Sequence, residues 1–564
     1  MAQQVTQSTI PSPGLEGLNT ELGSSVSDPR FAIVADNVVI DRIGRIQSRE
    51  AFASFAKPSI LKRSGTQDIM QMGVYYHGQY SREAAVPYPM CVIRVGDERD
   101  IYRYNPDTNA LDLELTPYSD VPEMDDGVFV NFKDDLFFFC KGKPVIRKTD
   151  PLDEWEDITA NPNYQGPIYS DGDITNRKID GDIACSAYGR LWVSGVDENY
   201  QEIHYCSLLD ELSWYDGRSA PDGNDPTFNF NDAGIINVQE YWPVEVDRIV
   251  GIAAHNGFLF VFGNNSTLVF ANANRGDPAS SGGIYLQDAI PNVGLVDKHA
   301  ITNTGNDVVF VDRSGLRSMG RVVQEKSNPM SEPSFNVRKM FRDVIERELM
   351  AVAKNEDAGV QLEYQPDKAN VIVLFKSQSL SYVFSTNSPS VTGGWKATTW
   401  SGCFFYCMKS AAAVDDCVTF LGGKQDRGLL RYKGYLEEDP YVMRYESTAL
   451  NLTQSSMQNV IPKSFYYIVY ANSIPAVGVS TYGYGQFMDF SEEFNIRVKG
   501  GSKWNVDRYS VGRYGLGEGL YFRYKVNTRG AGTHMRVGLE IEVNGDFFAL
   551  HEIAVNYAIG RIAA

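Results

Sequence analysis

Histidine and cysteine are scarce in this sequence of 564 residues, and neither is arranged to bind a metal. The six histidines lack the HxxxH, HExxH or HxH spacing of a local zinc site: His77, His204, His255, His299, His534 and His551. The seven cysteines are scattered: Cys91, Cys140, Cys185, Cys206, Cys403, Cys407 and Cys417. Cys403 and Cys407 have no second Cys or His pair near them, so we predict buried structural thiols in a reducing cytosol rather than zinc ligands.

Long apolar runs are missing too. No stretch approaches the roughly 18 apolar residues of a membrane-spanning helix, so we predict no membrane span. The first residues, MAQQVTQSTIPSPG, lack the basic start and apolar core of a signal peptide. We therefore expect a soluble protein that is made in the cytoplasm.

Motifs for catalysis and cofactor binding are also absent. The sequence has no GxSxG nucleophile elbow and no glycine-rich phosphate loop ending in Gly-Lys-Ser or Gly-Lys-Thr. The glycine-rich stretch Gly512–Gly519 has strand-like flanks, whereas a dinucleotide loop leads into a helix. The stretch Asp171–Asp182 resembles a calcium loop, but Asn176 replaces the glycine required at its sixth position. The sequence therefore predicts no catalytic, cofactor-binding or metal-binding residue and a protein that is not an enzyme.

Paired acidic residues occur at predicted turns. We interpret them as solvated turn carboxylates, because closeness in sequence does not make two carboxylates converge across a cleft, as a glycosidase requires. The pairs are Asp125-Asp126, Asp134-Asp135 and Asp415-Asp416.

Basic residues are outnumbered by acidic ones. Lys and Arg total 52 and Asp and Glu total 71, giving a net charge of -19. A protein that grips nucleic acid by neutralising phosphates should be basic, so a strong duplex or single-strand binder is disfavoured. An acidic surface suits a soluble particle, or a channel through which duplex slides without sticking.

Aromatic and turn-forming residues are abundant. The chain has 32 Tyr, 29 Phe, 50 Gly and 25 Pro. Aromatic side chains favour half-buried pleated surfaces, and glycine and proline form turns. This composition indicates an all-β protein.

A repeated pattern of short apolar runs joined by small polar turns extends from about Met70 to Lys433. The turns include Tyr188-Gly189, Asn256-Gly257 and Ser314-Gly315, which are typical of hairpins. Six or seven such units predict a β-propeller, although strands of this length would also fit a series of β-sandwiches. In this reading Trp395 and Trp400, within Ser385–Trp400, are aromatic residues that pack between blades.

One helix stands out within this β-rich region. Ser334–Ala353 has apolar residues at helical spacing and a charged opposite face, with Ser334 as its predicted N-cap. The charged face is most simply solvated, and the helix is also our candidate for a contact between subunits.

The two ends of the chain differ from the repeats. Residues 1–30 are rich in Gly, Ser, Pro and Gln and are predicted to form an extended arm, which is either mobile or ordered on a neighbouring subunit. Longer alternating runs near the C-terminus predict an antiparallel sandwich or barrel. We therefore predict an arm with the first strands in 1–52, a propeller in 53–433 and a C-terminal β domain in 434–564.

The segment Pro13–Phe52 resembles the opening of tail nozzle, or tail tubular, proteins of short-tailed bacteriophages. The matching phrase has the form "ADN…D…GRI…R", and its residues here are Ala35, Asp36, Asn37, Asp41, Gly44, Arg45, Ile46 and Arg49. Phe258–Asn272 is similar to a recurring blade phrase of that family. The stretch from Gly517 to Arg561 resembles its closing β domain.

This resemblance implies a structural virion protein located in the tail and assembled in the host cytoplasm. The family forms a homohexameric ring below the portal and adaptor proteins, carries fibres or a tail needle, and passes double-stranded DNA through its lumen without specific binding. We therefore expect net-acidic loops facing the channel, since a basic lumen would trap the duplex. No catalytic, cofactor or metal role is implied for any residue.

Two other functions are compatible with a propeller. One is the recognition or cleavage of host glycans, which would need converging carboxylates and exposed aromatic side chains. The other is an intracellular scaffold for protein partners. A glycan assay would identify the first, and a stable monomer that does not assemble on portal complexes would favour the second.

Overall fold

The computed structural model describes most of the chain. The described residues are 5–23, 28–41, 44–59, 65–78, 86–118, 121–167, 177–214, 233–243, 247–275, 283–325, 332–354, 356–412, 417–435, 440–453, 458–471, 476–484, 490–496, 520–545 and 547–562.

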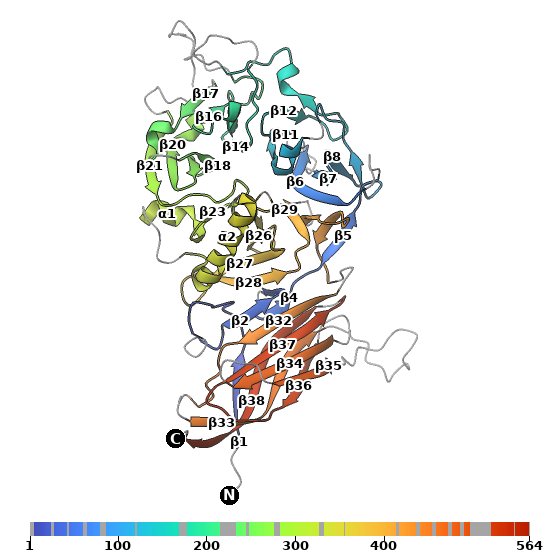
Figure 1. The fold of residues 1–564 in the computed structure, drawn as a ribbon, viewed down its shortest axis with the longest axis vertical. Helices are drawn as coiled ribbons and strands as arrows, with labels where there is room; N and C mark the ends of the chain where they lie inside the picture. The colour runs from blue at the N-terminus through green and yellow to red at the C-terminus, as the bar shows by residue number, and fades with distance from the viewer. Residues whose placement is uncertain are drawn as a thin grey trace.

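Seven antiparallel sheets are arranged as the blades of a propeller (Figure 1). The first two blades are β6 (Gln67–His77), β7 (Val86–Val95), β8 (Glu98–Asn105) and β9 (Ala110–Leu113), and β10 (Val128–Phe132), β11 (Asp135–Cys140), β12 (Lys143–Lys148) and β13 (Glu156–Asp157). The third and fourth are β14 (Ile183–Ala187), β15 (Arg190–Ser194), β16 (Glu202–Tyr205) and β17 (Gly234–Asn237), and β18 (Ile249–His255), β19 (Phe258–Gly263), β20 (Ser266–Ala271) and β21 (Tyr285–Pro291).

The remaining blades complete the ring. The fifth has three strands, β22 (Ile301–Asn303), β23 (Val308–Asp312) and β24 (Gly315–Ser318), and the sixth has β25 (Val360–Gln365), β26 (Asn370–Phe375), β27 (Leu380–Pro389) and β28 (Trp395–Ser401). The seventh has β29 (Phe405–Ala412), β30 (Cys417–Gly423), β31 (Leu429–Tyr432) and β5 (Phe52–Ala56). The first strand of each blade contacts that of the next, and β29 contacts β6. The predicted propeller is confirmed, with seven blades among the described residues.

Both faces of each blade are buried, which explains why its strands are apolar at successive positions. In β11, Phe137 and Phe139 pack against the third blade, whereas Leu136 and Phe138 pack against the first. Side chains alternate between the faces of a strand, so a strand buried on both sides needs an unbroken apolar run. The hydrophobic core of the propeller is therefore a series of layers between neighbouring blades.

The predicted hairpin turns lie between strands of single blades. Asn256 and Gly257 join β18 to β19 with φ values of 50° and 83°, and Tyr188 and Gly189 join β14 to β15 with 54° and 71°. Two successive positive φ values match the right-handed twist of the paired strands. These turns fix the register, in which His255 pairs with Phe258.

A β-sandwich lies below the propeller in Figure 1 and contains strands from both ends of the chain. One sheet contains β3 (Val38–Ile40), β4 (Ile46–Ser48), β38 (Phe548–Ile562), β33 (Gln458–Ala471) and β36 (Leu520–Asn527), with β1 (Val5–Pro11) beside β38. The other contains β2 (Ala32–Asp36), β32 (Tyr441–Ser447), β37 (Met535–Val543), β34 (Ala476–Tyr484) and β35 (Phe490–Ile496). The Tyr467 hydroxyl on β33 donates to the Gly538 carbonyl on β37 at 2.6 Å, joining the two sheets.

Strand β2 connects the sandwich to the propeller. It pairs in parallel with β28 of the sixth blade and antiparallel with β32, so one sheet of nine strands runs through both domains. Strand β5 follows in sequence and pairs with β31 as the outer strand of the seventh blade. The N-terminal segment therefore links the two domains and also completes the ring.

The described part of the N-terminal arm, residues 5–23 and 28–30, packs on its own chain, an arrangement that differs from the two alternatives considered from the sequence. Strand β1 pairs with β38 over its whole length, from Val5 opposite Ala558 to Pro11 opposite Glu552. Leu18 is buried beyond it. Backbone pairing and apolar burial explain why this segment, although rich in polar residues, packs against the sandwich.

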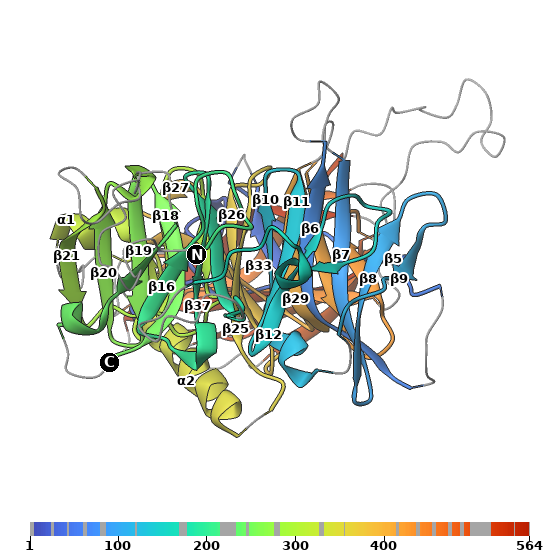
Figure 2. The same cartoon turned by 90° about the horizontal axis from the view of Figure 1, so that it is seen from above.

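The described helices are few and short. They are α1 (Met319–Glu325), α2 (Arg338–Ala353) and the 3-10 turns Pro122–Asp126, Ile158–Ala160, Val196–Glu198, Gln239–Tyr241, Ala273–Arg275 and Phe335–Val337. The predicted helix exists, but Ser334 does not cap it, because its hydroxyl accepts a hydrogen bond from Leu316 N–H at 3.0 Å. Helix α2 projects from one face of the propeller (Figure 2). No described helix is long and apolar enough to cross a membrane.

Closing the ring depends on β5, and Phe52 is its main apolar contact. Its ring lies 5.1 Å from that of Phe405 and 5.9 Å from that of Trp400, centroid to centroid. We predict that Phe52→Ala lowers the free energy of unfolding by about 3–5 kcal/mol in urea titrations. Phe404→Ala, at a half-exposed position, is the control and should change it by less than about 1 kcal/mol. Equal effects of the two substitutions would contradict this role of Phe52.

Carboxylates crowd around one arginine between the second and third blades. Arg147 Nη1 lies 2.7 Å from a Glu211 carboxylate oxygen and 3.6 Å from Asp135, and the guanidinium also pairs with Glu156. Burial raises the pKa of Asp135 to about 6, because Arg147 only partly offsets it and Glu211 adds negative charge. The Asp135 carboxyl therefore takes up its proton at a higher pH in the folded chain than in the unfolded chain.

This shift gives stability a predictable pH dependence. Between about pH 4 and pH 6 the folded chain holds a proton on Asp135 that the unfolded chain has lost, so the free energy of unfolding falls as pH rises. We predict that Asp135→Asn is more stable than the wild type by about 1–3 kcal/mol at pH 8, and that this difference shrinks towards pH 4. Urea titrations at both pH values measure it. Asp107→Asn, on an exposed turn, is the control, and a pH-independent difference for Asp135→Asn would refute the assignment.

Candidate functional site

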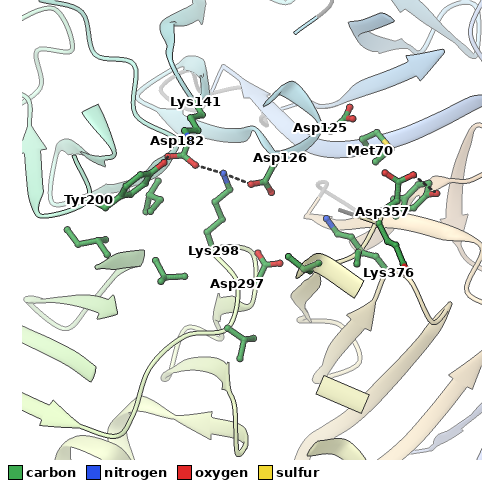
Figure 3. Close-up of a pocket in the computed structure, with 18 of the residues that line it drawn as sticks. Met70, Asp125, Asp126, Lys141, Asp182, Tyr200, Asp297, Lys298, Asp357 and Lys376 are labelled. Carbon is green, nitrogen blue, oxygen red and sulfur yellow. Dashed lines mark hydrogen bonds and ion pairs between the residues drawn. The ribbon is translucent and has the colours of Figure 1, made fainter. Parts of the chain in front are cut away.

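A pocket of about 480 Å³ lies where the seven blades converge on the propeller axis (Figure 3). Every blade contributes to its wall, from Met70 on β6 to Tyr406 on β29. The acidic lining residues are Asp125, Asp126, Asp182, Asp297, Glu356 and Asp357, and the basic ones are Lys141, Arg248, Lys298 and Lys376. This axial pocket is therefore strongly charged, unlike the apolar layers between the blades.

Lys298 connects blades on opposite sides of the axis. It precedes β22 of the fifth blade, and its Nζ lies 2.8 Å from Asp126 before the second blade and 2.8 Å from Asp182 before the third. The Tyr200 hydroxyl donates to Asp182 at 3.0 Å, and His299 Nε2 lies 3.1 Å from Asp126. These ion pairs cross the pocket in Figure 3 and hold three blades together.

The charges of this group stabilise one another. Asp126 is exposed to solvent at the pocket, and the Lys298 ammonium and the His299 imidazole hold its pKa well below its usual range. Burial would lower the pKa of Lys298, but Asp126 and Asp182 raise it above its usual value. Both partners therefore remain charged at neutral pH.

A second group of ion pairs joins the first and sixth blades. Arg94 on β7 lies 2.7 Å from Asp357, which precedes β25, and 3.3 Å from Asp68 on β6. Arg99 pairs with Asp125 at 2.9 Å. The hydrogen bond to Asp357 raises the pKa of Arg94 despite partial burial. Together the two groups bind the blades to one another across the axis.

The sequence prediction for Asp125 and Asp126 is corrected by this arrangement. They line the axial pocket and pair with Arg99 and with Lys298 and His299, rather than being only solvated turn residues. Their partners are up to 173 positions away in sequence, so no local motif could have identified them. Of the other acidic pairs, Asp134 lies in the turn before β11 as predicted and Asp135 is the first residue of that strand, and Asp415-Asp416 lies outside the described residues.

The histidines and cysteines occupy separate places in the fold. Burial lowers the pKa of His204 to about 3, so this side chain is neutral. Five cysteines are buried, Cys185 and Cys417 are partly exposed, and all are free thiols. Burial raises the pKa of Cys403 and of Cys407 to about 12. Among the described residues no group of three or more His, Cys, Asp or Glu side chains could hold a metal ion.

The remaining sequence candidates are partly described. Gly512–Gly519 and residues 171–176 of the calcium-like stretch lie outside the described residues. Trp400 is buried against Phe52 and Tyr432, between the sixth and seventh blades, and Trp395 is partly buried.

The phrase "ADN…D…GRI…R" singled out in the sequence lies at the junction between the two domains. Asp36 ends β2 and accepts hydrogen bonds from Thr399 at 3.0 Å and Ser401 at 2.5 Å, both on β28. Asn37 has a φ of 55° and donates to the Ser401 hydroxyl at 3.1 Å and the Val442 carbonyl at 2.9 Å. These two residues therefore bind the sixth blade to strand β32 of the sandwich.

Arg49 completes the junction. Its Nε donates to Asn37 Oδ1 at 2.9 Å and its Nη1 to the Glu50 carbonyl at 2.8 Å. The guanidinium lies 3.7 Å from the ring centroid of Phe52 and 3.9 Å from that of Tyr441, and Arg49 is only 1% exposed. The Tyr441 hydroxyl in turn donates to the Arg49 carbonyl. The charge is thus buried with hydrogen-bond acceptors and two aromatic faces around it.

Asp41, Gly44 and Arg45, from the middle of the phrase, lie between β3 and β4. Asp41 and Arg45 pair at 2.7 Å, and Gly44 between them has a φ of 85°. A Cβ atom at Gly44 would approach the Leu15 side chain to 2.5 Å. Arg45 also lies over the ring of Tyr470, 4.7 Å from its centroid. Each charged residue of the phrase therefore has a structural partner.

Substitutions at Asn37 distinguish the stabilisation that comes from its hydrogen bonds from the effect of its left-handed backbone conformation. Asn37→Ala removes its hydrogen bonds and places a side chain with a Cβ atom in the left-handed region, whereas Asn37→Gly removes only the hydrogen bonds. We predict losses in free energy of unfolding of about 3 kcal/mol for alanine and about 2 kcal/mol for glycine, measured in urea. Losses below about 0.5 kcal/mol for both would show that the network does not stabilise the junction.

No protein-family model and no curated protein matches this sequence. Similar solved structures include YCF48 from Cyanidioschyzon merolae, with 10% identity, coverage of 65% of this chain and 98% of that chain, and a TM-score of 0.31. The WD40 domain of Toxoplasma gondii coronin has 7% identity, coverage of 71% and 86%, and a TM-score of 0.33. Sqt1 from Saccharomyces cerevisiae has 9% identity, coverage of 71% and 99%, and a TM-score of 0.34. Similarities this weak carry no argument about function, and the fold is defined by the strand pairing of the chain itself.

Proposed function

We propose that this chain is a non-enzymatic structural subunit of the tail of a short-tailed bacteriophage, where it forms a homohexameric nozzle ring. The observation that carries the proposal is the junction built by the phrase within Pro13–Phe52. Asp36, Asn37 and Arg49 each bind the propeller to the sandwich, as expected of residues with a structural role. A ring that resists internal pressure needs its domains to be held together in this way.

The small size of the axial pocket favours a passage for DNA between subunits over a passage through the centre of a propeller. Ion pairs of Lys298 cross the axis, and about 480 Å³ is the size of a small-molecule site. A duplex would need far more room. In the proposed ring the duplex moves through a lumen that several copies of the chain surround.

The net charge favours the passage of DNA through the lumen over the retention of DNA by binding. At -19 the chain repels phosphate overall, so a lumen lined by acidic loops would let the genome slide. In the proposed particle the ring binds the adaptor and portal proteins on one side and carries fibres or a needle, and it assembles in the host cytoplasm.

Helix α2 is the proposed contact between neighbouring subunits. It packs through Phe341, Val344 and Ile345 on the propeller, but Met340 and Met350 are exposed on its outer surface. Met350 is 62% exposed. Methionine is flexible and is common at protein interfaces, and α2 projects beyond the propeller in Figure 2.

Mass photometry and negative-stain microscopy of the purified chain, alone and with a portal–adaptor complex, test this proposal. We expect sixfold rings, and we expect Met350→Glu to reduce assembly at least tenfold without changing the melting temperature, because it buries a charge at the interface. Leu115→Glu, at an equally exposed apolar position on another surface, is the matched control. A chain that stays monomeric with and without the portal complex would overturn the ring, and rings unaffected by Met350→Glu would overturn the role of α2.

A further inference from the structure

The side chain of Lys376 is buried in the wall of the axial pocket without a partner. It follows β26 in the sixth blade and is 6% exposed, yet its ammonium has no hydrogen bond or ion pair with any residue that the structure describes. Its main chain is fixed, since its N–H donates to the Gly359 carbonyl at 3.1 Å and its carbonyl accepts from Lys424 Nζ at 2.5 Å. Figure 3 shows the ammonium turned towards the cavity.

Four carboxylates of the pocket wall have other partners. Asp126 and Asp182 pair with Lys298, and Asp357 pairs with Arg94. Asp297 accepts hydrogen bonds from two backbone N–H groups, those of His299 at 2.9 Å and Val360 at 3.0 Å. None of these four described carboxylates is paired with the Lys376 ammonium.

The stem of Lys376 is packed into the wall, and its ammonium faces the pocket, where it is accessible to a ligand. A hydrogen bond from an ammonium to an anion is about twice as strong as one between neutral groups. This side of the pocket can therefore accept an anionic group.

We propose that the axial pocket binds a compact carboxylate through Lys376. A pocket of about 480 Å³ holds a ligand the size of one or two amino-acid residues. A single negative charge fits better than a phosphate dianion, because Asp126, Asp297 and Glu356 line the same pocket and repel further charge. The carboxylate comes either from a free small acid or from an acidic side chain that another protein inserts into the pocket.

Calorimetric titration of the full-length chain tests this site. The probes are N-acetylglycine for a free carboxylate, the peptide acetyl-Gly-Asp-Gly-amide for an acidic side chain, and acetyl-Gly-Asn-Gly-amide as its uncharged match. We expect saturable binding of at least one carboxylate probe, weaker binding of inorganic phosphate at the same ionic strength, and none of the asparagine peptide. Tighter binding of the aspartate peptide than of N-acetylglycine by about tenfold would identify a protein side chain as the source, and similar binding would identify a free acid as sufficient.

Variants at Lys376 decide whether it is the binding group. Lys376→Met keeps the length of the side chain without its charge and should weaken carboxylate binding at least tenfold, whereas Lys376→Arg should retain it within a few-fold. Lys178→Met, at a half-exposed position outside the pocket, is the control. Far-ultraviolet circular dichroism and melting temperature confirm folding. Absence of saturable binding to the wild type, or equal binding to Lys376→Met, would overturn the proposal, and neither result bears on ring assembly.

Discussion

The guanidinium of Arg49 lies between the rings of Phe52 and Tyr441, and each ring belongs to a different domain. Phe52 begins the strand that completes the seventh blade, and Tyr441 begins strand β32 of the sandwich. A buried guanidinium is tolerated only where its N–H groups find acceptors, and Asn37 supplies one of them. Because this contact needs both aromatic rings and the Asn37 turn at once, it fixes how the propeller and the sandwich meet.

The same segment makes each domain depend on the other. Strand β2 continues the sheet of the sixth blade into the sandwich, and β5 pairs with β31 nearly 375 positions later in the chain. Pairing over such a separation carries a large loop-closure cost and forms late in folding. The ring of blades is therefore complete only after β31, which ends at Tyr432, has been made, so a shorter nascent chain lacks the last pairing of its seventh blade.

Local sequence patterns were sufficient to predict the blades but not the strands with which the N-terminal segment pairs. Apolar runs and turns such as Asn256-Gly257 identify hairpins, because strand alternation and positive φ values are determined by neighbouring residues. The pairing of β1 with β38 and of β5 with β31 joins residues hundreds of positions apart, which periodicity cannot detect. The axial site was missed for the same reason, since Asp126 has turn-like neighbours and meets Lys298 only after five blades are in place.

Two kinds of interaction therefore hold the propeller together, and they act at different places. Apolar layers between blades supply burial but tolerate many similar side chains, so they specify the register of one blade on the next only weakly. The ion pairs of Lys298 and Arg94 are directional and join blades that are not neighbours in sequence. Seven blades that converge with these charges unpaired would leave them desolvated without compensation. The axial charges thus favour one closed arrangement of the seven blades.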